Sequence, residues 1–215
     1  MEIEGINIER LNHDCFKISK GSTVFYIDPF EIKDDEDAEL ILVTHEHHDH
    51  CSPPDLMKLS TEAKTTIVTI PDCLSKVAQV KAKDVKTMEP FQKIKLEHFE
   101  ISTIPAYNIN KFRSPGMPFH PKDDGKVGFI ITFAGKRIYH AGDTDAIPEM
   151  KQLKNIDVAL LPVSGIYVMT AEEAAEAARW INAKVTIPMH YGAIVGTKED
   201  AERFAKLYKG KVQIL

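Results

Sequence analysis

The sequence has few cysteines, a single tryptophan and no long apolar run. Its 215 residues contain three cysteines, Cys15, Cys51 and Cys73, in no paired spacing. An odd number of cysteines is typical of a reducing compartment and argues against a secreted domain built on disulfides. No apolar stretch approaches the length of a membrane span, and the first residues, MEIEGINIER, lack the apolar core of a signal peptide. We therefore expect a cytoplasmic protein without a membrane span.

Positive charge is also in short supply. The chain has 27 lysines and arginines against 32 aspartates and glutamates, which gives a formal net charge of -5 at pH 7. Because nucleic-acid surfaces depend on clustered basic side chains, we expect no nucleic-acid partner. No repeat, low-complexity tract or linker interrupts the chain. Its length and 43% hydrophobic content are sufficient for a full core, so we expect a single domain over 1–215.

The pattern of apolar residues predicts an α/β protein. Runs of apolar and β-branched residues predict strands at 15–18, 23–27, 40–43, 65–70, 94–96, 99–104, 127–133, 137–140, 158–161, 185–187 and 211–215. Helices are predicted at 53–59, 72–80, 170–181 and 197–209, the third opening on the capping box that starts at Thr170. The stretch 108–125 has three prolines and no clear period, so we expect a long loop or lid there.

Four side chains capable of binding metal occupy six consecutive residues, in His45-x-His47-x-Asp49-His50. Alternation in an extended chain points His45 and His47 the same way, and a break after them lets Asp49 and His50 turn toward a second ion. Imidazole and carboxylate together suit zinc, manganese or iron(II) rather than calcium or magnesium. The alternative is a solvated His-rich turn. The internal position beside a buried strand, with acids interspersed, favours a metal site.

Two later strand ends carry further residues of the ligand type. The strand predicted at 137–140 runs into Gly142-Asp143-Thr144, and the strand at 185–187 runs into a segment that contains His190. Ligands placed just past strand ends, beside glycine, can converge on one rim of a fold. The two oxygens of a carboxylate such as Asp143 can bridge two cations.

In these motifs the chain resembles the metallo-β-lactamase superfamily of metal-dependent hydrolases. The six-residue motif matches the signature of the superfamily, Gly142-Asp143-Thr144 matches its bridging aspartate, and 188–192 its last histidine. Stretches 11–16 and 161–165 are similar to the opening strand and a later strand of the compact branch with sugar-phosphate lactonases and N-acyl-phosphatidylethanolamine phospholipase D. The resemblance spans the whole chain and implies a four-layer αββα sandwich. It also implies a first ion on His45 and His47 and a second ion on Asp49, His50, Asp143 and His190.

One position departs from the family pattern. The family usually has a first-site histidine where this chain has Asn108, and a neutral amide oxygen binds a transition ion more weakly than imidazole does. His120 is a candidate replacement if its loop folds back over the site. The alternative is a lid histidine that contacts substrate or caps the loop.

Several side chains near these motifs have more than one possible role. His13 is either a buried structural residue or one that orients a ligand, whereas His48 should face solvent. Cys51 is expected to pack beside the site rather than bind metal. In the loop 108–125, Lys111, Arg113 and Lys122 could hold an anionic group, although a plain solvated loop is the preferred explanation.

These features predict a metal-dependent hydrolase that attacks an ester, lactone or phosphodiester with a metal-bound hydroxide. Zinc is the expected metal, with manganese or iron as alternatives, in one or two ions. Asp49 would orient the hydroxide or accept its proton. We expect a small-molecule substrate, with an anionic one as an option, and the sequence leaves the oligomeric state open. Two alternatives remain at this point: a metal-binding but catalytically silent protein, and a nuclease of the same superfamily.

Overall fold

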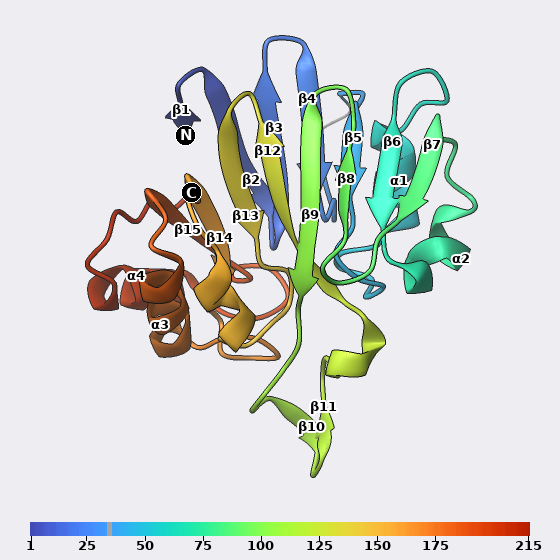
Figure 1. Cartoon of the computed structure of the whole chain (residues 1–215). Coiled ribbons are helices and arrows are strands. Elements are labelled where there is room, and N and C mark those ends of the chain that lie inside the picture. Colours follow the sequence, from blue (N-terminus) through green and yellow to red (C-terminus); the bar gives the residue numbers. More distant parts are fainter. Residues whose placement is uncertain (34–35) are drawn as a thin grey trace. The chain divides into compact units, whose positions relative to one another are not determined.

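The computed structural model describes residues 1–33 and 36–215, which form two compact units. We call Met1–Glu89 the N-terminal unit and Pro90–Leu215 the C-terminal unit. Each unit contains a sheet of its own (Figure 1). The single domain over 1–215 stays a prediction. Among the described residues, none of the helices combines the length and the apolar character needed to cross a membrane.

The N-terminal unit is built on a seven-stranded sheet whose strands lie in sequence order. The first four strands form an antiparallel meander, and the last three continue it in parallel. Their bounds are Glu2–Ile3 (β1), Ile6–Asn12 (β2), Cys15–Lys20 (β3), Thr23–Ile27 (β4), Leu40–Leu42 (β5), Thr66–Thr69 (β6) and Asp84–Thr87 (β7). The central strand β5 is fully buried, which explains its unbroken apolar sequence.

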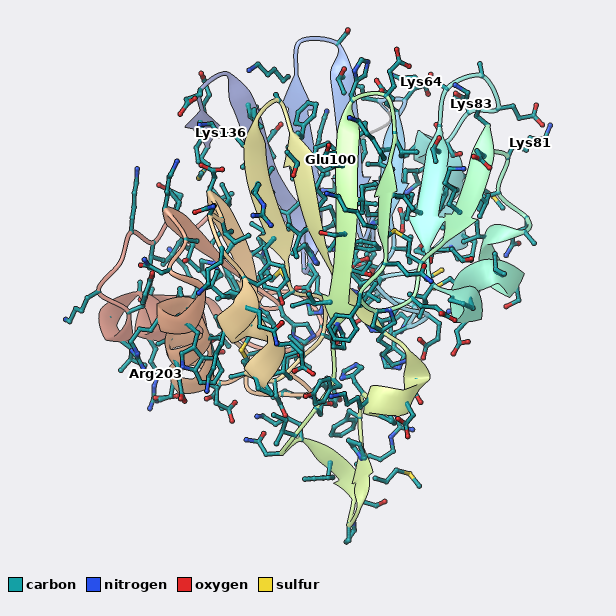
Figure 2. All side chains as sticks on the ribbon, in the orientation of Figure 1. Lys64, Lys81, Lys83, Glu100, Lys136 and Arg203 are labelled. Atoms are coloured by element: carbon teal, nitrogen blue, oxygen red, sulfur yellow. The ribbon has the colours of Figure 1, made fainter. Side chains whose placement is uncertain are left out.

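Short helices connect the parallel strands of this unit. Helix α1, Pro53–Leu59, joins β5 to β6, and the 3₁₀-helix Pro71–Cys73 continues into α2, Leu74–Val77. Helix α1 begins with two prolines, which suit a first turn that has no backbone N–H partners. Lys64, Lys81 and Lys83, labelled in Figure 2, precede β6 and β7 and so lie at the amino ends of these strands. The motif 45–50 follows the carboxyl end of β5, where α/β sheets place their ligands.

The C-terminal unit is built on a six-stranded sheet in the order β15-β14-β13-β12-β9-β8. Strands β8, β9, β12 and β13 pair antiparallel, and β13, β14 and β15 pair in parallel. Their bounds are Lys93–Lys95 (β8), Phe99–Pro105 (β9), Val127–Phe133 (β12), Lys136–His140 (β13), Val158–Pro162 (β14) and Val185–Met189 (β15). A separate hairpin, Phe112–Ser114 (β10) and Met117–Pro118 (β11), extends from the loop after β9 (Figure 1).

Helices of the C-terminal unit follow the last parallel strands. Helix α3, Ala171–Ile181, begins at the predicted capping box: the Thr170 hydroxyl accepts from Glu173 N, and the Glu173 carboxylate accepts from Thr170 N. At the start of helix α4, Lys198–Leu207, the backbone amide of Thr197 donates to the Asp200 carboxylate at 2.8 Å. Two 3₁₀-helices, Lys122–Asp124 and Pro148–Gln152, complete the unit.

The fold differs from the sequence prediction at several elements. Strands β1, β2 and β7 and the hairpin β10–β11 were not predicted, and the hairpin lies in the segment expected to be an irregular loop. The helix predicted at 72–80 is only a 3₁₀ turn followed by the single turn of α2. The stretch predicted to open the fold as a strand contains the turn between β2 and β3, at His13 and Asp14. Stretch 211–215 forms one bridge, Thr186 to Val212, and no longer strand.

Candidate metal centre

In the N-terminal unit, the first two motif histidines face each other. The distance from His45 Nε2 to His47 Nδ1 is 3.1 Å, as expected if alternation points the two rings the same way. The chain then turns, because the amides of His50 and Cys51 both donate to His47 O. This turn brings the ring of His50 to 4.0 Å from the ring of His45, between centroids. The motif thus gathers three imidazoles within one loop.

Asp28, at the end of β4, anchors this loop. Its carboxylate accepts from Thr44 N at 2.8 Å and from Thr44 Oγ1 at 2.6 Å, and its Oδ2 lies 2.8 Å from His50 Nδ1. The residue is fully buried and has a φ of +46°, a conformation that costs energy and is typical of functional sites. Sequence reasoning treated Asp28 only as the end of a strand. The available signal was a carboxylate at the carboxyl end of a buried strand next to the motif strand.

These contacts fix which nitrogen of two histidines carries the proton. A carboxylate can only accept, so His50 donates from Nδ1 to Asp28 and its Nε2 carries the lone pair. Thr44 Oγ1 gives its only hydrogen to Asp28 and must therefore accept from His45 Nδ1, 3.0 Å away. His45 also presents the Nε2 lone pair. An imidazole whose Nδ1–H is held by an acceptor is the usual state of a metal ligand.

Asp49 occupies the outer side of the turn and is partly exposed. Its Oδ2 lies 3.6 Å from His13 Nε2 and 3.7 Å from His50 Nε2. His13 is fully buried and has a φ of +34°. His48 is 76% exposed, with its Nδ1 3.6 Å from Asp49 Oδ1, which agrees with the predicted solvent-facing position. Of the two readings of His13, contact with Asp49 favours the orienting one.

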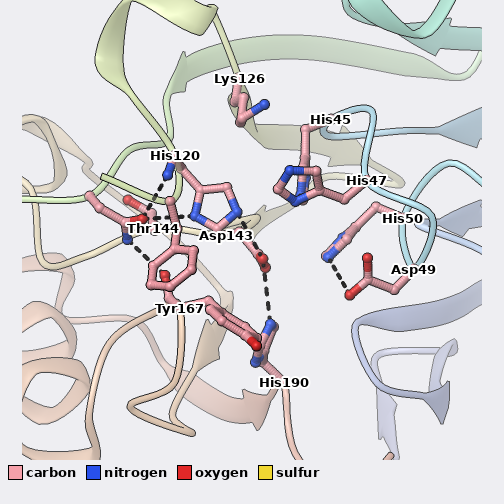
Figure 3. A network of polar contacts seen from close by, with 12 residues as sticks. His45, His47, Asp49, His50, His120, Lys126, Asp143, Thr144, Tyr167 and His190 are labelled. Carbon is pink, nitrogen blue, oxygen red and sulfur yellow. Dashed lines mark hydrogen bonds and ion pairs between the residues drawn. The ribbon is translucent and has the colours of Figure 1, made fainter. Parts of the chain in front are cut away.

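The C-terminal unit gathers a second group around Asp143, which follows β13. Asp143 Oδ2 lies 3.3 Å from His120 Nε2 and 3.4 Å from His190 Nε2 (Figure 3). All three residues are buried. The loop of Asp143 passes close to β12, since a Cβ added at Gly128 would lie 2.7 Å from Ala141 O. Only glycine at this position permits that approach.

Asn108 holds His120 rather than standing in its place. The Asn108 side-chain oxygen accepts from both His120 N and His120 Nδ1, each at 2.9 Å, and its amide nitrogen donates to Tyr167 O at 2.8 Å. His120 therefore carries the proton on Nδ1 and the lone pair on Nε2, the atom that faces Asp143. Asn108 and His120, the two alternatives for the missing ligand in the sequence, are thus hydrogen-bonded to each other. His120 is the candidate ligand, and Asn108 orients it.

His190, which follows β15, is held in the same way. Its Nδ1 lies 2.9 Å from Ser164 Oγ, and that hydroxyl donates its hydrogen to Ile166 O at 3.2 Å. Ser164 must accept from His190 Nδ1, so His190 also carries its lone pair on Nε2. The backbone φ of His190 is +60°. Ser164 was not predicted, since a lone serine after a strand gives no signal in the sequence.

Cys51, which was expected to pack beside the site, and two residues near the later motifs make structural contacts. Cys51 is buried and hydrogen-bonds Cys73, and together with burial this raises the pKa of the Cys51 thiol. His140 accepts from Gly142 N at 3.2 Å beneath the Asp143 loop. Tyr191 donates to Leu215 O at 3.1 Å.

The cations of the loop 108–125 are engaged in pairs. Lys111 Nζ lies 2.7 Å from Glu173 and 3.2 Å from Asp145, and Lys122 Nζ lies 2.9 Å from Glu149. Burial acts to raise the pKa of the Glu173 carboxyl, but the hydrogen bonds from Lys111, Thr170 N and Asn110 together outweigh it and hold that pKa below its usual range. These pairs weaken the reading of the loop as an anion-binding element.

Comparison with known proteins identifies the family of the chain. Residues 7–190 match the family described as Beta-lactamase superfamily domain, and the match covers residues of both units. The chain belongs to this family. A UPF0173 metal-dependent hydrolase of Methanoculleus marisnigri is 32% identical over 201 residues, 91% of this chain and 85% of the relative. Another, from Symbiobacterium thermophilum, is 34% identical over 93% of this chain and 90% of the relative.

Solved structures confirm the fold. The structure of a proposed metal-dependent hydrolase from Parabacteroides distasonis has a TM-score of 0.84 and 32% identity, over 97% of this chain and 92% of the other. A metallo hydrolase from Ignicoccus hospitalis has a TM-score of 0.75 over 98% of this chain and 94% of the other; at 24% identity it shows the fold alone. The predicted metallo-β-lactamase fold class is confirmed, and the chain is a metal-dependent hydrolase of this superfamily.

Proposed function

We propose that this chain hydrolyses a small-molecule ester, lactone or phosphodiester with two metal ions. His45, His47 and His120 would bind the first ion, and Asp49, His50 and His190 the second, with Asp143 shared between them. One observation carries the proposal. Four buried histidines have Nδ1 engaged by a side-chain oxygen that must accept, and each of them therefore carries its lone pair on Nε2.

The donors fit transition ions of intermediate softness. Imidazole nitrogens outnumber carboxylates and no thiolate is included, which suits zinc, manganese or iron(II) and does not suit calcium or magnesium. Buried imidazoles held by hydrogen bonds lose little freedom when an ion binds. The membership in a family of metal-dependent hydrolases supports the same assignment.

The residues of the chain would divide the work of hydrolysis. When bound, the ions would lower the pKa of a water toward neutrality and polarise the scissile carbonyl or phosphoryl oxygen. Asp49, partly exposed at the outer side of its turn, would orient the attacking water and accept its proton. His13, 3.6 Å from Asp49 Oδ2, would hold that carboxylate in place.

The contacts of Asn108 argue against the alternative of a metal-binding but catalytically silent protein. That alternative rested on the replacement of a family histidine by Asn108, which would leave the first ion short of a ligand. His120 supplies an imidazole in the same unit, and the Asn108 side chain serves it. This removes the main support for a catalytically silent protein. No observation favours the nuclease.

Metal analysis joined to a substrate panel tests the proposal. Protein stripped with a chelator is reloaded with zinc, manganese or iron(II), and bound metal is measured by mass spectrometry beside hydrolysis of aryl esters, lactones and bis(p-nitrophenyl) phosphate. We expect two ions per chain and hydrolysis of at least one class that the chelator abolishes. One ion per chain would overturn the dinuclear assignment. Two ions without hydrolysis of any class would overturn the activity.

A further inference from the structure

Exposed apolar side chains are concentrated on three loops of the C-terminal unit, two of which carry His120 and His190 and one of which carries Ser164, the partner of His190. Among residues 1–33 and 36–215, large exposed apolar side chains are otherwise scattered over both units. Three loops, which follow β9, β14 and β15, carry six of them: Ile109, Phe112, Met117, Ile166, Tyr167 and Ile194. Such a concentration on a monomer surface marks a binding site. We call these six side chains the apolar rim.

The three loops of the apolar rim contact one another. The rings of Phe119 and Tyr167 meet edge to face, with centroids 4.7 Å apart, and Tyr167 O accepts from Asn108. Ser164, two residues before Ile166, contacts His190, and a Cβ added at Gly196 would lie 2.6 Å from Ser164 Cβ. The apolar rim therefore belongs to one continuous surface of the C-terminal unit.

The hairpin of the apolar rim is fixed at its base to the candidate ligands. Asp145, two residues after Asp143, accepts from Ile109 N at 2.6 Å and from Asn110 N at 2.9 Å. His120, where the chain returns from the hairpin, accepts at its backbone oxygen from the backbone N–H of Asn108 at 2.9 Å. The segment that presents Phe112 and Met117 thus begins beside Asp143 and ends at His120. A ligand that extends along the hairpin toward its base would approach the candidate ligands.

Charge argues for an uncharged occupant of the apolar rim. Lys111 and Lys122 are paired with carboxylates, as described above. Arg113 lies over the ring of Phe119, 5.8 Å from its centroid, and donates to Phe119 O. The cations of the hairpin are therefore engaged within the protein, which leaves the apolar side chains as its main contact surface. An anionic lipid headgroup or an anionic substrate end would find little attraction there.

From these observations we propose that the apolar rim binds the uncharged hydrocarbon part of the substrate, with Phe112 and Met117 as specificity-determining residues. The inference rests on the proposed function, because it takes the occupant to be the molecule that the metal centre hydrolyses. It narrows the substrate class to one with an alkyl or aryl group beside the scissile bond.

Two series of probes with increasing chain length test the inference. In the first, p-nitrophenyl esters from acetate to octanoate are hydrolysed by the zinc-loaded protein. In the second, the unreactive carboxylates acetate, butyrate, hexanoate and octanoate are titrated calorimetrically, which needs no turnover. A fully buried methylene raises affinity about fourfold. On an open surface we expect about 1.5-fold per methylene, or roughly tenfold from acetate to octanoate in both series.

Variants assign the chain-length effect to the hairpin. The double variant Phe112→Ser/Met117→Ser should flatten both series, with the largest losses for the octanoate members. The control is Phe91→Ser, which removes another exposed aromatic of the C-terminal unit, 67% exposed and outside the three loops. It should retain the full chain-length effect.

Each other outcome overturns the inference or separates it from the proposed function. A flat series in the wild type would overturn it. If the series is flat, and the wild type sediments as a dimer whereas the double variant sediments as a monomer, the apolar rim binds a second copy of the chain. If the series is flat, and the wild type binds phosphatidylcholine vesicles whereas the double variant does not, the apolar rim binds a lipid surface. A rising carboxylate series without hydrolysis of any ester would leave the inference standing and overturn the proposed function.

Discussion

The two units carry their candidate ligands in opposite ways. In the N-terminal unit, four of them stand within six consecutive residues, on one turn after β5. In the C-terminal unit, His120, Asp143 and His190 come from three loops separated by whole strands. Yet in each unit two histidines, His45 and His50 in the first and His120 and His190 in the second, are held through Nδ1 by a neighbouring oxygen. These four ligand atoms are prepared alike, although only one set can be seen as a motif.

The oxygens that hold the histidines differ in charge. Asp28, which holds His50, is a carboxylate, whereas Thr44, Asn108 and Ser164, which hold His45, His120 and His190, are neutral. A carboxylate partner makes an imidazole more basic and a stronger ligand than a neutral partner does. His50 of the N-terminal unit should therefore be the strongest of these nitrogen donors, and the other three should be easier to perturb.

The largest effect is expected at Asp143, where two candidate ligands of the C-terminal unit meet. Asp143→Ala should remove at least one ion and lower kcat/KM by about a thousandfold or more, because the shared carboxylate is lost. Metal analysis and thermal unfolding followed by circular dichroism check the result, since the apolar core should still fold. Asp123→Ala, an exposed acid in the same unit, is the control. Full metal content in Asp143→Ala would show that this carboxylate does not bridge.

The second effect separates a ligand from the residue that orients it. His120→Ala should lose an ion, whereas Asn108→Ala should keep it with about 10- to 100-fold weaker affinity, as expected when an orienting partner of a ligand is removed. Isothermal titration of zinc into each stripped variant measures the difference. Asn108→His should not strengthen binding, because His120 already supplies the imidazole. Unchanged affinity in both alanine variants would mean that neither residue serves the metal.

Most strands could be predicted because each one is a local pattern. Strands β4 and β12 agree with the sequence to the residue, since runs of β-branched and aromatic residues end at a turn residue. Strand β7 was missed because DVKT is a mostly exposed edge strand with little apolar content. The hairpin β10–β11 has no alternating pattern, and its prolines indicated a loop.

Only the residues that would bind metal directly could be predicted from the sequence. Motif spacing and strand ends indicated six metal residues, and each falls within a polar cluster of its own unit. The residues that hold the histidines could not be predicted. Asp28 lies 22 positions from His50, and Ser164 lies 26 positions from His190. Their function depends on strand pairing in the folded chain, which no local pattern reveals.

The difference in charge between the holding residues can be tested directly. Asp28→Asn should weaken binding of one ion by about 10- to 100-fold, whereas Ser164→Ala should weaken binding by at most about tenfold. Asp28→Asn should also lower the melting temperature, since an amide has only one accepting oxygen for the three donors that the two carboxylate oxygens now satisfy. Metal titration and thermal unfolding of both variants provide the comparison. Equal losses of affinity would show that the charge of the partner does not matter here.

The smallest effect is expected at His48, inside the motif itself. Its side chain is 76% exposed, against 35% for His47, and its contact with Asp49 at 3.6 Å is an exposed pair of the kind worth less than about 1 kcal/mol. His48→Ala should keep its full metal content, with kcat/KM within about twofold of the wild type. His47→Ala, one residue away, should lose an ion and serves as the matched variant. If His48→Ala also loses an ion, the alternation that points His45 and His47 toward the metal would be wrong.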